Sequence, residues 1–317
     1  MSEWRPTADF TALGRRAQLL CQIRGFFAAR GVLEVETPLL ASAPVTDPNI
    51  EAVSAQSPSG EGLMYLQTSP EFAMKRLVAA GSGPIYQICK AFRRGERGRR
   101  HNPEFTMLEW YRPNMSLDAL IDEVVAVVAL AVGDADVAQM TYQQVFELHC
   151  GLNPHAASLD QLKACAMEHL DLSFDSDDRD LWLQLLMSSV VEPALNPKQI
   201  SIVYDFPETQ AALAKIAVNG DGQRVARRFE AFYAGMELAN GYDELRDAGE
   251  LVRRISDDHS RRAAAGQDLP PIDRYLLKAM AKMPECSGVA IGFDRLAMIA
   301  CGAERIDEVI AFPLESV

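Results

Sequence analysis

Two apolar segments separated by a long, basic loop constrain the fold of this chain more than any other feature. Pro84–Phe92 and Phe105–Tyr111 each have the length and apolar character of a buried strand. The loop between them, Arg93–Glu104, is polar and longer than a hairpin turn requires. We therefore expect two neighbouring strands whose connecting loop has a role beyond joining them.

The other predicted elements indicate a largely antiparallel α+β fold. Further strands are expected at Val32–Glu36, Ile200–Phe206, Arg228–Ala239 and Ser287–Phe293, of which the third has a periodicity that also suits a helix. Helices are expected at Arg15–Ala29, 70–80, 116–132, 158–192 and Arg295–Ala300. The second would be capped by Ser69 and begin with Pro70. Residues 41–60 are predicted to be a loop. Regular βαβ alternation is absent from this order, so we expect one α+β domain, 1–317, with a mainly helical insertion at about 115–200.

The composition is that of an ordinary globular protein. The chain has 317 residues, of which 48% are hydrophobic and 24% charged. No segment reaches the roughly 20 apolar residues of a membrane helix, and the polar residues 1–6 do not read as the start of a signal peptide. The six cysteines form no Cys-x-x-Cys pair, which argues against a zinc site and favours reduced thiols in a cytoplasmic protein.

The net charge argues against stable binding of RNA. It is −13 at neutral pH, and a field of this sign repels a polyanion. Proteins that wrap RNA usually present a basic face, because neutralised phosphates supply much of their affinity. A local basic patch remains compatible with this charge.

The loop after Phe92 concentrates positive charge in this acidic chain. Six of the eleven residues from Lys90 to Arg100 are basic. Guanidinium groups bind phosphate oxygens in pairs of hydrogen bonds, although a solvated charged loop would have the same composition. Glu109 and Tyr111 follow two residues apart on the next predicted strand, so they face the same side and suit a ligand with an ammonium group. This combination favours the ligand-binding interpretation.

A second segment contains two candidate metal ligands. Glu237 and Glu244 are seven residues apart, with Asn240 and Gly241 between them. A turn or bulge at Gly241 would let both carboxylates reach one divalent ion. Two glutamates at this spacing are more often surface residues, so the segment alone is a weak indication.

A third segment, Gly288–Arg295, is a candidate for nucleotide contacts. Gly292 permits a flat ring to approach the backbone closely, and Arg295 lies at the predicted junction between strand and helix. Taken alone, a structural strand that contains glycine explains this segment better.

In this order, the three segments together resemble the motif 2, metal-site and motif 3 segments of class II lysyl-tRNA synthetases. The string RHNPEFTM at 100–107 is specific to the lysine, aspartate and asparagine group of these enzymes. Val32–Pro38 resembles motif 1, their dimer-interface element, and Thr68–Glu71 resembles their amino-acid-binding turn. The resemblance extends from about residue 15 to 313. It implies the class II catalytic fold, in which helices flank an antiparallel sheet, and a homodimer.

The resemblance also implies activation of a carboxylate with ATP and magnesium. The carboxylate attacks the α-phosphorus and pyrophosphate leaves, so positioning and charge neutralisation replace a protein nucleophile. The catalytic residues, Arg93 and Arg295, would hold the α- and γ-phosphates. The ATP site would comprise Arg93, Arg94, Gly95, Glu96, His101, Asn102, Phe105, Glu237, Leu238, Gly292 and Arg295, with magnesium on Glu237 and Glu244. The amino-acid site would comprise Ser69, Pro70, Glu71, Glu109, Tyr111, Asn240, Glu244 and Ala290.

Three departures from the lysyl-tRNA synthetase pattern narrow the interpretation. The usual Arg-x-Glu of motif 2 has Gly95 in place of its glutamate, so we expect a shifted loop in which Glu96 substitutes. Ala290 stands where the family has a glycine that borders the amino-acid pocket. The added methyl group should weaken binding of L-α-lysine by about 1–3 kcal/mol. The alternative is that the change from glycine to alanine is neutral. Motif 1 begins at about residue 32, which leaves no room for an N-terminal OB-fold that reads the anticodon.

All three departures match one branch of the family. Its members make an (R)-β-lysyl-adenylate and transfer β-lysine to a lysine side chain of translation elongation factor P. The resemblance therefore implies ATP, (R)-β-lysine or lysine, and elongation factor P as partners, without stable tRNA binding. Two alternatives stay open: an enzyme that forms lysyl-adenylate or charges tRNA, and an inactive paralogue that acts as a regulatory binding protein. Retention of Arg93, Glu237, Glu244 and Arg295 argues against the inactive paralogue, because this set together is what ATP and magnesium chemistry requires.

Overall fold

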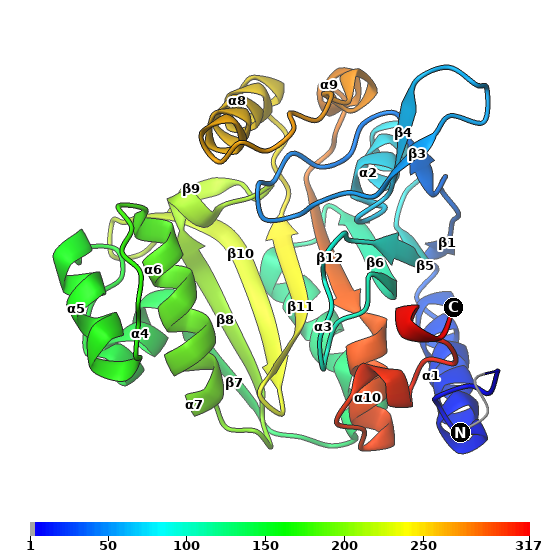
Figure 1. The fold of residues 1–317 in the computed structure, drawn as a ribbon, viewed down its shortest axis with the longest axis horizontal. Coiled ribbons are helices and arrows are strands. Elements are labelled where there is room, and N and C mark those ends of the chain that lie inside the picture. Colours follow the sequence, from blue (N-terminus) through cyan, green and yellow to red (C-terminus); the bar gives the residue numbers. More distant parts are fainter. Residues whose placement is uncertain (1–3) are drawn as a thin grey trace.

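A large twisted sheet forms the centre of the molecule, and the computed structural model describes it within residues 4–317 (Figure 1). Residues 1–3 of the N-terminal segment considered above lie outside the described part. The strand order is β1-β5-β6-β12-β11-β10-β8-β7, with β9 paired to β10. All pairs are antiparallel except β1–β5 and β7–β8 at the two edges, which confirms the antiparallel α+β prediction. The strands are β1 (Leu33–Glu34), β5 (Ile85–Phe92), β6 (Glu104–Pro113), β7 (Val137–Thr141), β8 (Ile200–Pro207), β9 (Ile216–Val218), β10 (Arg224–Tyr233), β11 (Met236–Asp243) and β12 (Cys286–Gly292).

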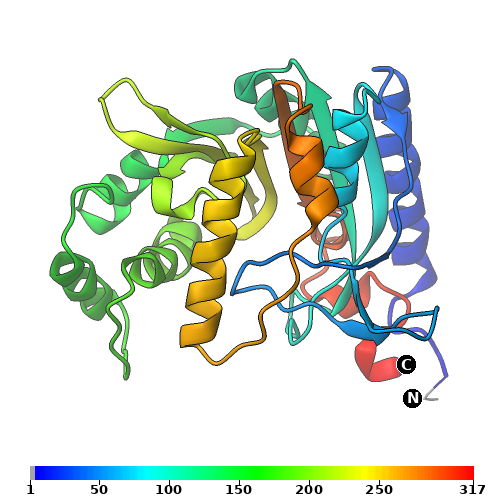
Figure 2. The ribbon, with the colours of Figure 1, turned by 90° about the horizontal axis from the view of Figure 1, so that it is seen from above.

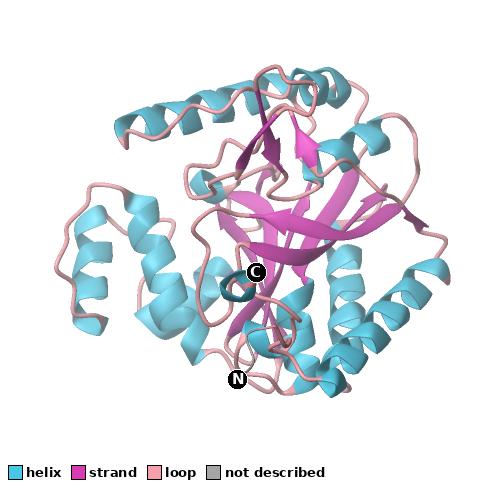
Figure 3. Cartoon of the chain, turned by 45° about the vertical axis from the view of Figure 1, so that its right-hand side comes forward, coloured by secondary structure: helices cyan, strands magenta, loops and turns pink. Residues whose placement is uncertain are grey.

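The helices lie in separate groups around this sheet (Figure 3). They are α1 (Phe10–Ala28), α2 (Glu71–Ala79), α3 (Leu117–Val132), α4 (Tyr142–Cys150), α5 (Leu159–His169), α6 (Arg179–Leu186), α7 (Glu192–Ala194), α8 (Ala248–Ala264), α9 (Arg274–Met280) and α10 (Phe293–Cys301). Seen from above, α8 lies beside α9, which contacts α2 (Figure 2). Within residues 4–317, no helix combines the length and apolar character that a membrane crossing needs.

The main core lies between one face of the sheet and helices α1, α3 and α10. Leu108 and Trp110 of β6 and Ile291 of β12 are fully buried there, together with Phe27 of α1. Side chains alternate between the two faces of a strand, so the residues between these core positions point to the opposite face. That opposite face carries the candidate site.

A second core covers the β8 end of the opposite face. Helices α4, α5 and α6 pack there around Trp182, Phe146 and Phe206. The helices expected at 116–132 and 158–192 are therefore present. However, α3 packs in the main core, away from α4–α7, so the proposed insertion at about 115–200 contributes to two cores. Its description as an insertion stays an interpretation.

Two predicted elements were wrong in their extent. The first helix begins at Phe10 rather than Arg15, because Asp9 caps it by accepting a hydrogen bond from the Ala12 amide. Residues 41–60 were predicted as a loop, but they include β3 (Ser54–Gln56) and the end of β2 (Leu40–Ala41). Both strands pair with β4 (Leu63–Leu66) in a small separate sheet, a long-range pairing that the polar local sequence does not indicate.

The segment predicted as one strand, Arg228–Ala239, is divided between β10 and β11. A tight turn at Ala234 and Gly235, both with positive φ, reverses the chain between the two strands. The expected bulge exists, but it lies at Leu238 rather than at Gly241, which pairs regularly with Phe229. Gly241 is instead required for packing, because a Cβ atom there would lie 2.4 Å from the Phe229 ring.

Candidate active site

A cavity of about 400 Å³ opens on the sheet face opposite the main core. Strands β6, β10, β11 and β12 form its floor, and the loop Arg93–Glu104 and the start of α2 form its walls. The structure brings almost all the predicted site residues to this one cavity. The exceptions are Pro70, Arg94 and Gly95. The Arg94 side chain is 72% exposed and faces Glu51 at 3.9 Å.

Strand β12 runs along the floor and defines the long axis of the cavity. Gly288, Ala290 and Gly292 all line it, as the period of two predicts. Ala290 pairs with Glu109 on one side and with Asn240 on the other. The Ala290 position therefore lies between two predicted amino-acid-binding residues.

Gly288, two residues before Ala290, is required for the shape of the pocket. A Cβ atom at Gly288 would lie 2.3 Å from Glu244 Oε1 and 2.5 Å from the Tyr111 ring. Both neighbours are buried and held by hydrogen bonds or ion pairs, so they have little freedom to retreat. Taken alone, the segment suggested a structural strand, whereas the family resemblance placed Ala290, Gly292 and Arg295 in the site; the structure shows a strand that also forms the floor of the cavity.

One end of the cavity is rich in carboxylates. Tyr111 donates a hydrogen bond to Glu109 Oε1 at 2.6 Å, which confirms that these two residues face the same side. Within the described residues, the other Glu109 oxygen is buried without a hydrogen-bond partner. Burial raises the pKa of Glu109 to about 8, and the nearby Glu71 carboxylate adds to this rise. An unpaired buried carboxylate of this kind is suited to receive an ammonium group.

A buried lysine that sequence reasoning missed lies among these carboxylates. Lys75 Nζ is 2.5 Å from Glu71 Oε1 and 2.6 Å from Glu244 Oε2. Burial opposes the charge of Lys75, but Glu244 and Glu71 together raise its pKa above the ordinary value. Burial also raises the pKa of Glu244, to about 8, and Lys75 opposes that rise. We assign the pair as ionised because the two contacts are short and Lys75 touches both carboxylates.

The other end of the cavity is rich in arginines. Arg295 donates to the Glu237 carbonyl at 2.7 Å and contacts His101 Nε2 at 2.6 Å. An arginine can only donate, so His101 Nε2 is the acceptor. This assignment agrees with the lowered pKa of His101, which burial and the charge of Arg295 cause. Arg93 and Arg100 line the same end.

The motif 2 loop departs from the family pattern in a way that the structure explains. Gly95 occupies a turn with φ of 80°, which a glutamate would adopt only with strain. Glu96 instead lines the cavity and lies 3.4 Å from Arg93, whose guanidinium stacks over the Phe105 ring. The shift of the loop and the substitution by Glu96 stay predictions. The contact of Glu96 with adenine stays a prediction.

The two predicted magnesium ligands lie in different surroundings. The Glu244 side chain is only 1% exposed and contacts Lys75, whereas Glu237 is more accessible and lies 3.5 Å from Arg295. Glu230 of β10, which sequence reasoning missed, lines the cavity too. Burial raises the pKa of Glu230 to about 7 against the opposing charge of Arg228, and Glu237 contributes to the rise. Glu230 and Glu237 are therefore electrostatic neighbours.

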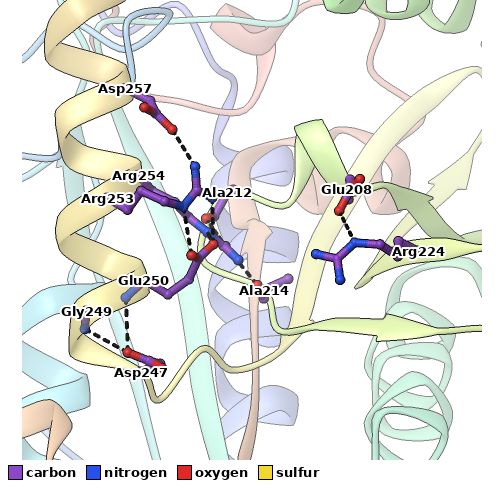
Figure 4. Close-up of polar contacts among 10 residues, drawn as sticks. All are labelled: Glu208, Ala212, Ala214, Arg224, Asp247, Gly249, Glu250, Arg253, Arg254 and Asp257. Carbon is purple, nitrogen blue, oxygen red and sulfur yellow. Dashed lines mark hydrogen bonds and ion pairs between the residues drawn. The ribbon is translucent and has the colours of Figure 1, made fainter.

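Helix α8 holds one wall of the cavity through Arg254 (Figure 4). Arg254 donates to the Ala212 carbonyl at 2.6 Å and to the Ala214 carbonyl at 2.8 Å, while Glu250 accepts from its Nε. Ala212 lines the cavity with a φ of 46°, a conformation that costs a non-glycine residue free energy. The guanidinium group therefore stabilises a strained wall segment.

The same helix holds a second wall through Arg262. This side chain is buried and donates to the carbonyls of Thr46, Asp47 and Ile50 at 2.6–2.8 Å. Asp47 and Ile50 line the cavity. Two arginines on one helix therefore hold two loops that line the cavity.

Comparison with known proteins agrees with this fold. The family model of class II tRNA synthetases (D, K and N) matches residues 5–316. The chain therefore belongs to the class II tRNA synthetases. Among its relatives, a protein of Erwinia tasmaniensis named elongation factor P–(R)-β-lysine ligase is 48% identical over 99% of this chain and 98% of its own length. Proteins of the same name from Salmonella arizonae and Salmonella dublin are 46% identical over 98% of each chain.

The raised pKa of Glu109 predicts a pH-dependent affinity for diammonium ligands such as lysine. In the free protein Glu109 is mostly protonated below about pH 8, and an ammonium group favours its ionised form. Affinity should therefore rise between about pH 6.5 and 8, with release of about one proton per ligand near pH 7. Calorimetry in buffers with different ionisation enthalpies measures this proton. Glu109→Gln should remove the dependence, and an affinity that falls over this range would contradict the assignment.

Proposed function

We propose that this protein is an ATP-dependent ligase that activates (R)-β-lysine as an adenylate and transfers it to a lysine side chain of translation elongation factor P. The observation that carries this proposal is the distribution of charged side chains along this cavity. Carboxylates line one end, beside Gly288, and arginines line the other, beside Gly292. A lysine-type substrate with its ammonium groups at the first end directs its carboxylate toward phosphates held at the second.

The chain's own residues account for the activation step by positioning and charge. Arg93 would stabilise the charge that develops on the α-phosphate, and Arg295 would hold the γ-phosphate. The neutral His101 would leave the Arg295 charge available to the phosphates. The substrate carboxylate attacks the α-phosphorus, the bond to the bridging oxygen breaks, and pyrophosphate leaves. No covalent intermediate with the protein is required, because fixed donors aimed at the reacting phosphate lower the barrier.

Glu237 and Glu230 are the carboxylates best placed to hold magnesium. Glu237 lies beside Arg295, at the end where the phosphates would lie, and it raises the pKa of Glu230, so these two carboxylates are neighbours. The main charges that act on Glu244 are instead Lys75, Glu71 and Asp243, and Glu230 is ion-paired with Arg228 just as Glu244 is with Lys75. The described residues contain no cluster of three or more His, Cys, Asp or Glu side chains suited to a metal. Two carboxylates fit an ion that takes its other ligands from phosphate and water. When bound, magnesium would neutralise phosphate charge.

Several features favour elongation factor P over tRNA as the acceptor. The relatives of similar length carry the name of the elongation factor P ligase, and the net charge of −13 opposes stable binding of a polyanion. Ala290 lies between Glu109 and Asn240, where a methyl group would crowd an α-amino acid more than a β-amino acid. An inactive paralogue is disfavoured, because both phosphate-binding arginines line the cavity.

The assembly and location that we propose follow the same reasoning. A homodimer through the segment 32–38 is supported by the edge strand β1, whose Leu33 is 57% exposed. Closed two-fold dimers are the commonest assembly of such chains. A cytoplasmic location suits a partner that acts in translation, and within the described residues all six cysteines are unpaired.

The proposed function predicts pyrophosphate exchange that depends on the lysine isomer. With magnesium and ATP, the protein should exchange pyrophosphate faster with (R)-β-lysine than with L-α-lysine. Purified elongation factor P should then gain the mass of one lysyl residue, whereas lysine tRNA should gain none. Arg295→Ala is the inactive control, and its activity should fall about 10²–10³-fold. Exchange with neither isomer, or efficient tRNA charging, would overturn the proposal.

The magnesium assignment predicts different defects for three glutamates. Glu237→Gln and Glu230→Gln should each slow exchange about 10²–10³-fold and raise the magnesium concentration needed. Glu244→Gln should instead raise the KM for the amino acid with an unchanged magnesium requirement. Glu208→Gln is the matched control, because Glu208 pairs with Arg224 away from the cavity. If Glu244→Gln shifts the magnesium requirement and Glu230→Gln leaves it normal, the ligands are instead Glu237 and Glu244, the pair predicted from the sequence.

Ala290 is expected to select between the two lysine isomers. Ala290→Gly removes the methyl group between Glu109 and Asn240, so activity with L-α-lysine should increase more than activity with β-lysine. One methyl group in a pocket discriminates by roughly 1–3 kcal/mol, so the ratio of the two kcat/KM values should move about 10- to 200-fold. A change below about threefold would show that other lining residues, such as Tyr242, set the preference.

A further inference from the structure

A buried ammonium group of the protein contacts two of the carboxylates that line one end of the cavity. Lys75 is 4% exposed and joins Glu71 to Glu244 through contacts of 2.5 and 2.6 Å. A lysine is almost never buried so deeply unless carboxylates compensate its charge. Its ammonium group thus occupies the kind of place that a ligand's ammonium group would take.

Both partners of Lys75 are held in place by the backbone. Glu71 is one helical turn before Lys75 on α2, a spacing that puts the two side chains on the same helix face. Glu244 follows the last residue of β11, and its amide donates to the Cys286 carbonyl at 2.9 Å. Lys75 therefore links the start of α2 to the end of β11.

The third carboxylate of this end stays open. Glu109 accepts one hydrogen bond, from Tyr111, and within the described residues its second oxygen has no hydrogen-bond partner. Once a bound ammonium group has ionised Glu109, the three carboxylates and the Lys75 ammonium group leave two negative charges. This number equals the number of ammonium groups on a lysine or a β-lysine, and a pocket with a matched count avoids burying an unpaired charge.

We propose that Lys75 is a specificity-determining positioning residue, a built-in ammonium group that fixes Glu71 and Glu244 and sets the pocket's charge for a substrate with two ammonium groups. This inference rests on the proposed function and extends it. Without Lys75 the cavity would hold an unpaired carboxylate beyond those the substrate can satisfy. Glu71 and Glu244 would also lose the contact that sets their separation.

The test is chemical rescue of the Lys75→Ala variant by small alkylammonium ions. Lys75→Ala should raise the KM for (R)-β-lysine at least about 30-fold in pyrophosphate exchange, with the KM for ATP nearly unchanged. Millimolar methylammonium or ethylammonium should restore at least a tenth of the lost kcat/KM, because it can occupy the vacated space. Methanol, which is neutral, should not. Lys75→Met fills the same space without charge, so it should show the defect and resist rescue.

A second lysine in the chain provides the control. Lys163 also contacts two carboxylates, Asp175 and Asp177, but it does so at α5, away from the cavity. Lys163→Met should leave both KM values as they are. If wild-type protein shows no exchange with (R)-β-lysine, the proposed function has failed. If wild type is active and Lys75→Met keeps its KM, or Lys75→Ala melts normally but ignores alkylammonium ions, the role of Lys75 is wrong.

Discussion

The alternation of side chains along the central strands is the constraint on which the rest of the structure depends. Leu108 and Trp110 enter the main core while Glu109 and Tyr111, their neighbours on β6, face the cavity. Strand β12 repeats this division, with small residues on the cavity side. Because one face buries large apolar side chains, the register cannot slip by a residue without exchanging core and site. The stability of the sheet and the position of the site are therefore set together.

The charged face opposite that core carries a cost that the free protein offsets only in part. Buried carboxylates are unfavourable unless they are paired and hydrogen-bonded. Lys75 pairs with Glu71 and Glu244, and Tyr111 satisfies one oxygen of Glu109. The remaining oxygen is left for a ligand. Affinity at this end thus derives from relief of a desolvated carboxylate as well as from new contacts.

Sequence reasoning located the parts of the site that are contiguous in the chain. The basic loop and the Glu109–Tyr111 pair could be found because loop length, charge and a period of two are local signals. Lys75 was missed because only its spacing from Glu71 is local, while its second partner, Glu244, follows a distant strand. Arg262 was missed for a similar reason, since its acceptors are carbonyl groups of a loop far earlier in the sequence.

The bulge at Leu238 explains why one strand supplies both ends of the cavity. Glu237 and Glu244 are an odd number of residues apart, so in a regular strand they would face opposite sides of the sheet. Leu238 lacks a partner on β10, and both Leu238 and Ala239 pack in the main core, although Leu238 also borders the cavity. The phase of the strand therefore changes between Glu237 and Asn240. Glu237 lies beside Arg295 while Glu244 reaches Lys75, so a single extra residue lets this segment contribute to both ends of the cavity.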